Sequence, residues 1–363
     1  MVANSTQANS TQALNRLGQS LWLDNITRDL LDKGVLERYI RDFSVTGLTS
    51  NPSIFNSAIS KSAAYDADIA GQEEASDEDL FFGLAIDDLV RAADFFAPIH
   101  KRTGTVDGFV SLEVSPELAY DAAATVKQAK TLFALAKRPN LFIKIPGTAE
   151  GVAAIEEAIF AGIPVNVTLL FSTEQYLASA HAYMRGLERR VEAGLSPDVR
   201  SVASLFVSRW DVAVHDKVPA PMRNTLGMAA SRQAFKAYRD LLESDRFQRL
   251  ENAGARAQKL LFASTGTKDK SASDILYVEG LAAPNTVNTM PEETLLAFAG
   301  HGGAPQALAR DGDDAEAVLA AHAKAGIDLK ALASKLQADG AASFVKSWRD
   351  LMAAISSKRS GPR

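Results

Sequence analysis

A lysine stands in the middle of the short apolar segment Leu141–Thr148. The segment contains β-branched residues and ends in Pro-Gly, which is typical of a buried strand. Burial disfavours the charged form of a lysine side chain and lowers its pKa. A neutral amine in a dry pocket attacks carbonyl groups and forms Schiff bases, so Lys144 is a candidate nucleophile. The alternative is a lysine on the solvent face of an edge strand, whose ammonium group extends into water.

Further polar side chains lie on or directly after other predicted strands, where a barrel core would normally be apolar. Asn166 and Thr168 are two residues apart, so they point to the same side of their strand. Any one of these residues could instead cap a helix or pack a methyl group. Together they would converge on one cavity. The residues of this set are Asp24, Thr49, Asn51, Glu113, Asn166, Thr168, Ser204, Arg209, Ser264, Thr265 and Lys268.

Short β-rich runs alternate with helical stretches along the chain. We expect strands at Leu21–Asn25, Val45–Asn51, Gly108–Val114, Leu141–Pro146, Pro164–Phe171, Val202–Arg209, Lys259–Thr265 and Leu276–Ala282. We expect helices at Leu80–Ile99, Pro116–Lys137, Thr148–Ala161, Ser172–Ala193, Met228–Ser244 and Pro291–Phe298. Eight strands separated by helices predict an α/β fold, a (β/α)8 TIM barrel. An open doubly wound sheet is the alternative, but no glycine fingerprint follows the first run.

The two ends of the chain differ in character from the middle. Residues 1–13 contain a polar five-residue repeat and are expected to form a disordered tail, and residues 356–363 a loose C-terminus. Between them, residues 14–355 are expected to form one domain. Its last part, residues 314–355, predicts two or three extra helices whose apolar stripe, Phe344, Trp348, Leu351 and Ile355, packs against the barrel. A mobile lid over the site is the alternative.

Composition narrows the class of protein. The 363 residues carry a formal net charge of -5, which argues against a nucleic-acid partner. There is no cysteine, and the five histidines show no metal-ligand spacing, so we expect neither a metal nor another cofactor. Without a signal-like N-terminus or a long apolar run, we expect a cytoplasmic protein that does not contact membranes.

Three segments carry a resemblance to a known family. They are Thr49–Ser53 (TSNPS), Asn140–Gly151 (NLFIKIPGTAEG) and Val165–Ser172 (VNVTLLFS). In this order they resemble the signatures of transaldolase, and the chain is most similar to the longer bacterial branch of that family. The resemblance covers residues 14–355. It implies a transferase that moves a dihydroxyacetone unit from a ketose phosphate to an aldose phosphate in the non-oxidative pentose phosphate pathway.

The resemblance also implies catalytic roles for four residues. Lys144 would attack the C2 carbonyl of the ketose and form an imine, which serves as the electron sink for cleavage of the C3–C4 bond. Asp24 would take the proton of the C4 hydroxyl. Glu113 would act as acid and base in dehydration of the carbinolamine, through a water oriented by Thr168.

Substrate binding falls to a second group of residues under the same resemblance. Arg209 matches the phosphate arginine of the family, and its guanidinium suits a phosphate group. Gly266 stands where the classical branch has a further arginine, so Lys268 and Thr265 are expected to complete the phosphate site. The expected binding residues are Thr49, Asn51, Asn166, Ser204, Arg209, Ser264, Thr265 and Lys268.

Two other functions stay open at this point. A fructose-6-phosphate aldolase-like lyase on the same scaffold would release free dihydroxyacetone, although related aldolases carry glutamine where this chain has Glu113. A catalytically silent barrel that binds sugar phosphates would need no set of Lys144, Glu113 and Asp24. The expected partners are sugar-phosphate substrates, and the protein is expected to be a monomer or a homodimer.

Overall fold

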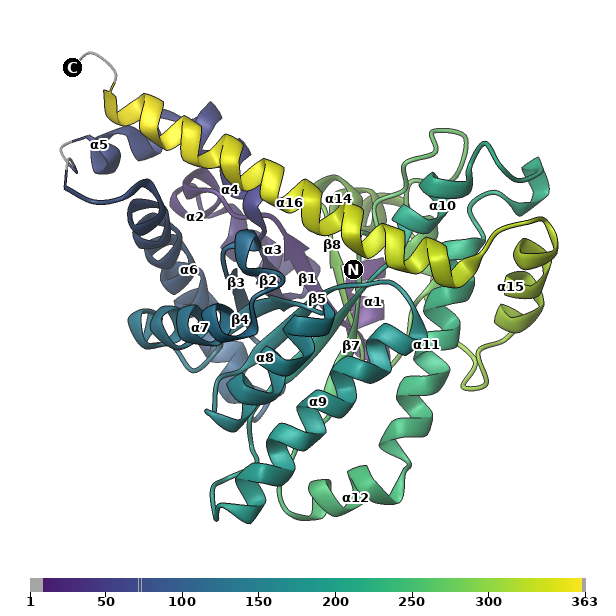
Figure 1. Ribbon diagram of the computed structural model, residues 1–363. Helices are drawn as coiled ribbons and strands as arrows, with labels where there is room; N and C mark the ends of the chain where they lie inside the picture. Colours follow the sequence, from purple (N-terminus) through teal and green to yellow (C-terminus); the bar gives the residue numbers. More distant parts are fainter. Residues whose placement is uncertain (1–8, 71, 73, 361–363) are drawn as a thin grey trace, which may run out of the picture.

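A closed barrel of parallel strands forms the centre of the computed structural model, which describes residues 9–70, 72 and 74–360 (Figure 1). The strands follow one another around the barrel in chain order. They are β1 (Ser20–Asp24), β2 (Val45–Thr49), β3 (Val110–Glu113), β4 (Leu141–Pro146), β5 (Val165–Leu170), β6 (Ser201–Phe206), β7 (Gln258–Ala263) and β8 (Val287–Met290). The predicted (β/α)8 fold is confirmed, and the open doubly wound alternative is wrong.

Helices surround this barrel on the outside (Figure 1). In the first half they are α1 (Ser10–Leu17), α2 (Arg28–Asp32), α3 (Val35–Phe43), α4 (Pro52–Lys61), α5 (Asp66–Ile69), α6 (Asp77–Arg102), α7 (Ala122–Ala136) and α8 (Ala149–Phe160). In the second half they are α9 (Thr173–Glu192), α10 (Ser208–Val214), α11 (Leu226–Leu242), α12 (Asp245–Asn252), α13 (Leu276–Gly280), α14 (Glu292–His301), α15 (Ala315–Lys324) and α16 (Leu329–Ser360).

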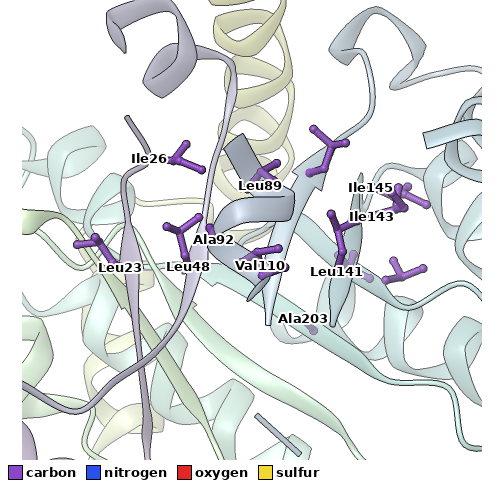
Figure 2. Packing of buried hydrophobic residues seen from close by; sticks show 14 of the residues in the cluster. Leu23, Ile26, Leu48, Leu89, Ala92, Val110, Leu141, Ile143, Ile145 and Ala203 are labelled. Atoms are coloured by element: carbon purple, nitrogen blue, oxygen red, sulfur yellow. The ribbon is translucent and has the colours of Figure 1, made fainter. Parts of the chain in front are cut away.

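The alternation of side chains along each strand separates two apolar layers. On β4, Leu141, Ile143 and Ile145 point outward and pack with the helices, where they join Leu89 and Ala92 of α6 (Figure 2). The residues between them, Phe142 and Lys144, therefore point into the barrel. Register places Lys144 beside Glu113 of β3 and beside Asn166 of β5. The local strand pattern thus aims the lysine inward, and the pairing of strands brings its neighbours to it.

The predicted eighth strand is wrong. Residues 276–280 form helix α13, and the eighth strand is Val287–Met290. A short apolar run has no periodicity that separates a buried helical turn from a buried strand. Gly280 also lies against Met228, whose side-chain atoms would come within 2.4 Å of a Cβ at that position. The true strand was missed because its four residues, Val-Asn-Thr-Met, neither alternate between apolar and polar nor form an apolar run.

The structure also shortens both predicted tails. Helix α1 begins at Ser10, and the Asn9 side chain accepts a hydrogen bond from the Gln12 backbone N–H at 2.9 Å. The predicted disorder is therefore wrong for residues 10–13, and residues 1–8 lie outside the described part of the chain. Helix α16 continues through residues 356–360, where Lys358 donates to the Ser62 carbonyl at 2.8 Å. The loose C-terminus is wrong for these residues, and residues 361–363 lie outside the described part.

Helix α16 runs across the carboxyl end of the barrel as one long helix (Figure 1). The predicted stripe of Phe344, Trp348, Leu351 and Ile355 is buried along its length. Trp348 packs edge-on against Phe81 of α6, with ring centroids 5.1 Å apart. The predicted packing of this stripe is confirmed. Because of this packing, the first half of the helix is held above the ends of the strands.

Candidate active site

A cavity of about 630 Å³ opens at the carboxyl end of the barrel, beneath helix α16. Last residues of several strands line it, among them Asp24, Thr49 and Ala263. Helix α16 contributes Leu336, Asp339 and Phe344. Of the residues predicted from the sequence, the lining includes Asp24, Thr49, Asn51, Lys144, Thr168, Ser204, Arg209, Ser264 and Lys268.

Lys144 is buried at the wall of this cavity, with 5% of its surface exposed. Its Nζ donates to Oε2 of Glu113 at 2.9 Å and to the backbone carbonyl of Ser50 at 3.0 Å. Nζ also lies 5.5 Å from the ring centre of Phe344. The alternative of a lysine on the solvent face of an edge strand is therefore wrong. Its nitrogen is sheltered, and a carboxylate that can exchange a proton with it lies within hydrogen-bond distance.

Glu113 ends strand β3 and is itself buried, with 6% of its surface exposed. Burial raises the pKa of its carboxyl group, and the attraction of Lys144 opposes that rise. Asp24 and Glu113 also repel each other, which raises the pKa of Glu113 further. A carboxyl group whose pKa is raised holds its proton to a higher pH than an exposed one, and this suits it to exchange protons as a general acid and base.

Asp24 is the second carboxyl group of the site and ends strand β1. Burial raises its pKa, and Lys144, the hydrogen bond from Thr49 and Lys268 lower it. The Thr49 hydroxyl donates to Oδ1 of Asp24 at 2.7 Å and lies 2.6 Å from the hydroxyl of Thr289. Since Thr49 has one proton to donate, Thr289 is the donor of the second bond. Two threonines from neighbouring strands thus fix the orientation of the Asp24 carboxyl group.

Strand β5 contributes two polar side chains in different situations. Thr168 lines the cavity and is fully buried, and its hydroxyl has no hydrogen-bond partner among the described residues. Asn166 lies two residues before Thr168 on the same strand. Its side chain donates to the hydroxyl of Ser111 at 3.0 Å and accepts from the hydroxyl of Ser204 at 2.7 Å. Asn166 does not line the cavity and sits beside Lys144 in the barrel wall. The unpaired Thr168 hydroxyl is available to a water molecule or a substrate.

The far side of the cavity is cationic. Arg209 is half-buried, lies over the rings of Phe206 at 5.0 Å and Phe344 at 5.9 Å, and makes no ion pair within the described residues. Burial lowers the pKa of its guanidinium, and Glu113 opposes that shift. Lys268 also lines this side and is exposed. A half-buried arginine without a carboxylate partner is suited to an incoming anion.

Three predicted residues differ in position from what the sequence indicated. Arg209 lies in the first turn of α10, because strand β6 ends at Phe206. Asn51 is the N-cap of α4, and its Oδ1 accepts from the backbone N–H of Ser53 at 3.0 Å. Thr265 is fully buried and does not line the cavity; its hydroxyl donates to Oδ1 of Asn288 at 2.9 Å. The expected phosphate contact of Thr265 is therefore contradicted by its burial.

The sequence did not indicate several residues that line the cavity. Ser208 has its hydroxyl 2.9 Å from that of Ser264, and Thr289 belongs to the strand that was misplaced. Phe344 was identified only as a packing residue. Ser208 lies within the predicted strand Val202–Arg209, directly before the candidate Arg209, and could have been found by that signal, whereas Asp339 of α16 carries no local signal at all. No group of three or more His, Cys, Asp or Glu side chains with metal-binding geometry occurs in the part of the chain that the structure describes. In that same part, no helix has the length and apolar character to cross a bilayer.

Comparison with known proteins identifies the family. The sequence model of the family described as transaldolase/fructose-6-phosphate aldolase matches residues 21–355. A transaldolase of Thiobacillus denitrificans is 44% identical over 357 residues, covering 96% of this chain and 99% of the relative. A transaldolase of Arthrobacter sp. is 41% identical, covering 94% of this chain and 95% of the relative. A transaldolase 2 of Streptomyces coelicolor is 43% identical, covering 94% and 96%. The chain therefore belongs to the transaldolase/fructose-6-phosphate aldolase family.

Proposed function

We propose that the protein is a transaldolase, which transfers a dihydroxyacetone unit from a ketose phosphate to an aldose phosphate through a Schiff base on Lys144. The donor would be sedoheptulose 7-phosphate or fructose 6-phosphate, and the acceptor glyceraldehyde 3-phosphate or erythrose 4-phosphate. The observation that carries this proposal is Lys144, which lines the cavity together with Asp24 and is bonded at 2.9 Å to the buried Glu113 behind the lining.

The first step needs a neutral amine. Glu113 lies 2.9 Å from Nζ and can accept a proton from it, and burial, which raises the pKa of the Glu113 carboxyl group, favours the protonated acid. The amine then attacks the ketose C2 carbonyl, and the oxygen takes up a proton to give a carbinolamine. Glu113 supplies the proton for loss of the hydroxyl as water. The unpaired hydroxyl of Thr168 would hold the water through which this proton travels.

Carbon–carbon cleavage follows from the protonated imine. The C4 hydroxyl gives its proton to Asp24, the C3–C4 bond breaks, and its electron pair moves to the imine to leave an enamine on Lys144. The donor's remaining aldehyde departs. In the reverse sense the enamine carbon attacks the acceptor aldehyde, and Asp24 returns the proton to the new hydroxyl. Hydrolysis of the imine then releases the product ketose and restores Lys144.

Binding of the three-carbon unit falls to polar groups around the lysine. Thr49 and Asn51 would hydrogen-bond its hydroxyl groups directly, because both line the cavity. Ser204 also lines the cavity, and its bond to Asn166 links the bound unit to the residue beside Lys144. We assign Asn166 an orienting role, since it reaches the cavity only through such neighbours.

The phosphate would lie at the cationic side of the cavity. Arg209 supplies the half-buried guanidinium, Ser264 a hydroxyl, and Lys268 a mobile ammonium group in place of the arginine that the classical branch has at Gly266. The backbone at Ser264 has a φ of 56°, a left-handed conformation that costs a non-glycine residue free energy. This strained turn presents the Ser264 and Ser208 hydroxyls together to the cavity.

A lyase that releases free dihydroxyacetone is the second candidate, because the family includes fructose-6-phosphate aldolases. The carboxylate at Glu113 favours transfer, since the aldolases of the resemblance carry glutamine there. The distinguishing experiment supplies fructose 6-phosphate with and without erythrose 4-phosphate. We expect sedoheptulose 7-phosphate with the acceptor and almost no free dihydroxyacetone without it. Steady release of dihydroxyacetone in the absence of acceptor would overturn the transferase assignment. A cytoplasmic location and a monomeric or homodimeric state stay predictions.

A further inference from the structure

A second cavity, of about 400 Å³, opens at the amino-terminal end of the barrel, on the side away from Lys144. It is lined by residues at the start of two strands, Ser201 of β6 and Lys259 of β7, by the end of helix α11 and by helix α12. Its volume lies within the range of small-molecule sites, roughly 300–1,000 Å³. Neither the proposed reaction nor its substrate site uses this cavity.

An aromatic layer closes the inner end of this second cavity. The ring of Phe142 lies 4.2 Å from that of Phe109 and 6.0 Å from that of Trp22, measured between centroids. Trp22 is anchored by its Nε1, which donates to Asp107 at 2.9 Å. Phe142 precedes Lys144 by two residues and points to the same side of β4, so this layer separates the two cavities. An organic group that enters the second cavity meets apolar surface at its inner end.

The walls of this cavity carry more positive than negative charge. The lining includes the four cations Arg200, Arg239, Arg256 and Lys259 and the two anions Glu243 and Glu251. Glu243 is already engaged by Arg310 on the surface, outside the cavity lining. Arg239 also pairs with Glu243 at 3.6 Å, and Arg200 pairs at 3.1 Å with Asp198, which does not line the cavity. Among the described residues, the lining therefore holds two cations without an ion pair, Arg256 and Lys259, against one such carboxylate, Glu251.

Lys259 is the most unusual of these cations. Leu261 and Ala263 follow it at intervals of two, and both belong to the apolar cluster inside the barrel, so the Lys259 side chain also enters the barrel. Burial lowers the pKa of its ammonium group, Asp107 opposes that shift, and repulsion from Arg200 adds to it. Among the described residues, Lys259 makes neither a hydrogen bond nor an ion pair. The buried Nε of Arg239, in the same cavity, has no partner either.

One buried donor without a partner, Nε of Arg239, and two cations without an ion pair, Arg256 and Lys259, call for an anion with several acceptor oxygens. Guanidinium groups match the oxygens of a phosphate, and the cavity is deep enough to take an organic group behind it. We propose that the amino-terminal cavity is a second ligand site that binds a small phosphate monoester, with Arg256 on the phosphate and Lys259 beside the organic part.

Pyridoxal 5′-phosphate is a direct probe of this site, because it joins a phosphate to a flat ring that bears an aldehyde. The Lys259 amine adds to the aldehyde and loses water to give an imine, and borohydride delivers hydride to the C=N bond and fixes the adduct. Peptide mapping then gives the rate of labelling at each lysine. The experiment uses the full chain with Lys144→Met, so that the catalytic lysine does not compete.

The site predicts a labelling rate at Lys259 about tenfold above that at the exposed Lys127, the ratio that one charge-assisted contact gives. Free pyridoxal, which lacks the phosphate, should lose this preference, and inorganic phosphate should protect Lys259. Arg256→Gln should abolish the preference. Arg249→Gln, which removes an exposed arginine of α12 that does not line the cavity, should leave it unchanged.

Two outcomes would overturn the proposal. In the first, pyridoxal 5′-phosphate labels Lys259 no faster than Lys127. In the second, Lys259 reacts fast but equally fast with free pyridoxal and in the Arg256→Gln variant, which would make it a reactive buried amine without an anion site. Both outcomes are independent of transaldolase activity, because the labelled protein lacks the catalytic lysine.

Discussion

Nζ of Lys144 lies 2.9 Å from Oε2 of Glu113, and the two residues are direct register partners on adjacent strands of the barrel. Their separation is therefore set by backbone hydrogen bonding between β3 and β4, with no loop involved. A nucleophile and its proton acceptor held on rigid strands keep their geometry through the reaction cycle. The following predictions test what this arrangement and its surroundings do.

Asp24→Asn should slow carbon–carbon cleavage more than it slows imine formation. The amide keeps the shape of the side chain and can still accept from Thr49, but it cannot take the C4 hydroxyl proton. We expect a fall in turnover of about 10²–10⁴-fold, the range for loss of a general base. Single-turnover experiments with fructose 6-phosphate measure both steps, by borohydride trapping of the imine and by release of erythrose 4-phosphate. An equal loss in both steps would contradict the role of Asp24.

The raised pKa of Asp24 also predicts a pH-dependent effect on stability. The folded carboxyl group binds its proton more tightly than the unfolded one, whose pKa is near 3.8. The protonated Asp24 carboxyl group therefore contributes to the free energy of unfolding at low pH, and this contribution is lost as the pH rises from 3.8 through the higher pKa of the folded state. Relative to wild type, Asp24→Asn should be more stable above that window and should lose this advantage below it. Urea midpoints of both proteins at several pH values measure the difference, and an advantage that grows toward low pH would contradict the prediction.

Arg209→Met should discriminate between phosphorylated and unphosphorylated substrates. The guanidinium has no carboxylate partner among the described residues, so its removal leaves no buried charge behind and mainly removes the phosphate contact. We expect kcat/KM for fructose 6-phosphate to fall by about 10²-fold, which corresponds to one or two charge-assisted hydrogen bonds. Activity with unphosphorylated fructose should change little. Similar losses with both sugars would place Arg209 in the chemistry or in the fold.

Gln337→Ala should loosen the strand that carries Thr168. The Gln337 side chain donates to the carbonyls of Gly147 and Leu169, at 2.9 Å each, and Leu169 has a φ of 59° in an irregular part of β5. Loss of both bonds should cost about 1–3 kcal/mol of stability. Turnover should fall while KM stays nearly constant, because Thr168 would be misplaced. Gln337→Glu, which keeps the shape but sets acceptor oxygens against the two carbonyl groups, should be at least as damaging as the alanine variant. An unchanged kcat in both variants would show that this contact does not position β5.

The sequence indicated those parts of the molecule that depend on local pattern. The inward lysine was predictable because Leu141–Pro146 is apolar on both sides of Lys144, and the first seven strands were predictable for similar reasons. Strand β8 was not, since its residues Val-Asn-Thr-Met show neither the alternation of an amphipathic strand nor an apolar run. The sequence analysis assigned Thr265 to the phosphate site because of its neighbours in the chain. Its hydroxyl instead donates to Asn288, a residue of another strand, and this bond keeps the side chain in the barrel wall.

Residues contributed by helix α16 were the least predictable part of the site. The apolar stripe showed that Phe344 is buried, but nothing local indicated that its ring lies 5.5 Å from Nζ of Lys144. That contact depends on the placement of a helix residue that lies 200 positions after the lysine in the chain. Distant packing of this kind is set by the assembled fold, and local patterns do not encode it.

The most direct test of the central claim is borohydride trapping with fructose 6-phosphate, followed by peptide mass mapping. We predict a reduced dihydroxyacetone adduct on Lys144 in the wild-type protein. Lys144→Met should give no adduct and no turnover while it keeps a cooperative thermal transition, because a thioether suits an apolar strand and the raised pKa of Glu113 lets that carboxyl group become neutral. Lys144→Met combined with Glu113→Gln serves as the folding control. An adduct on another residue, or a wild-type protein without any adduct, would contradict the account.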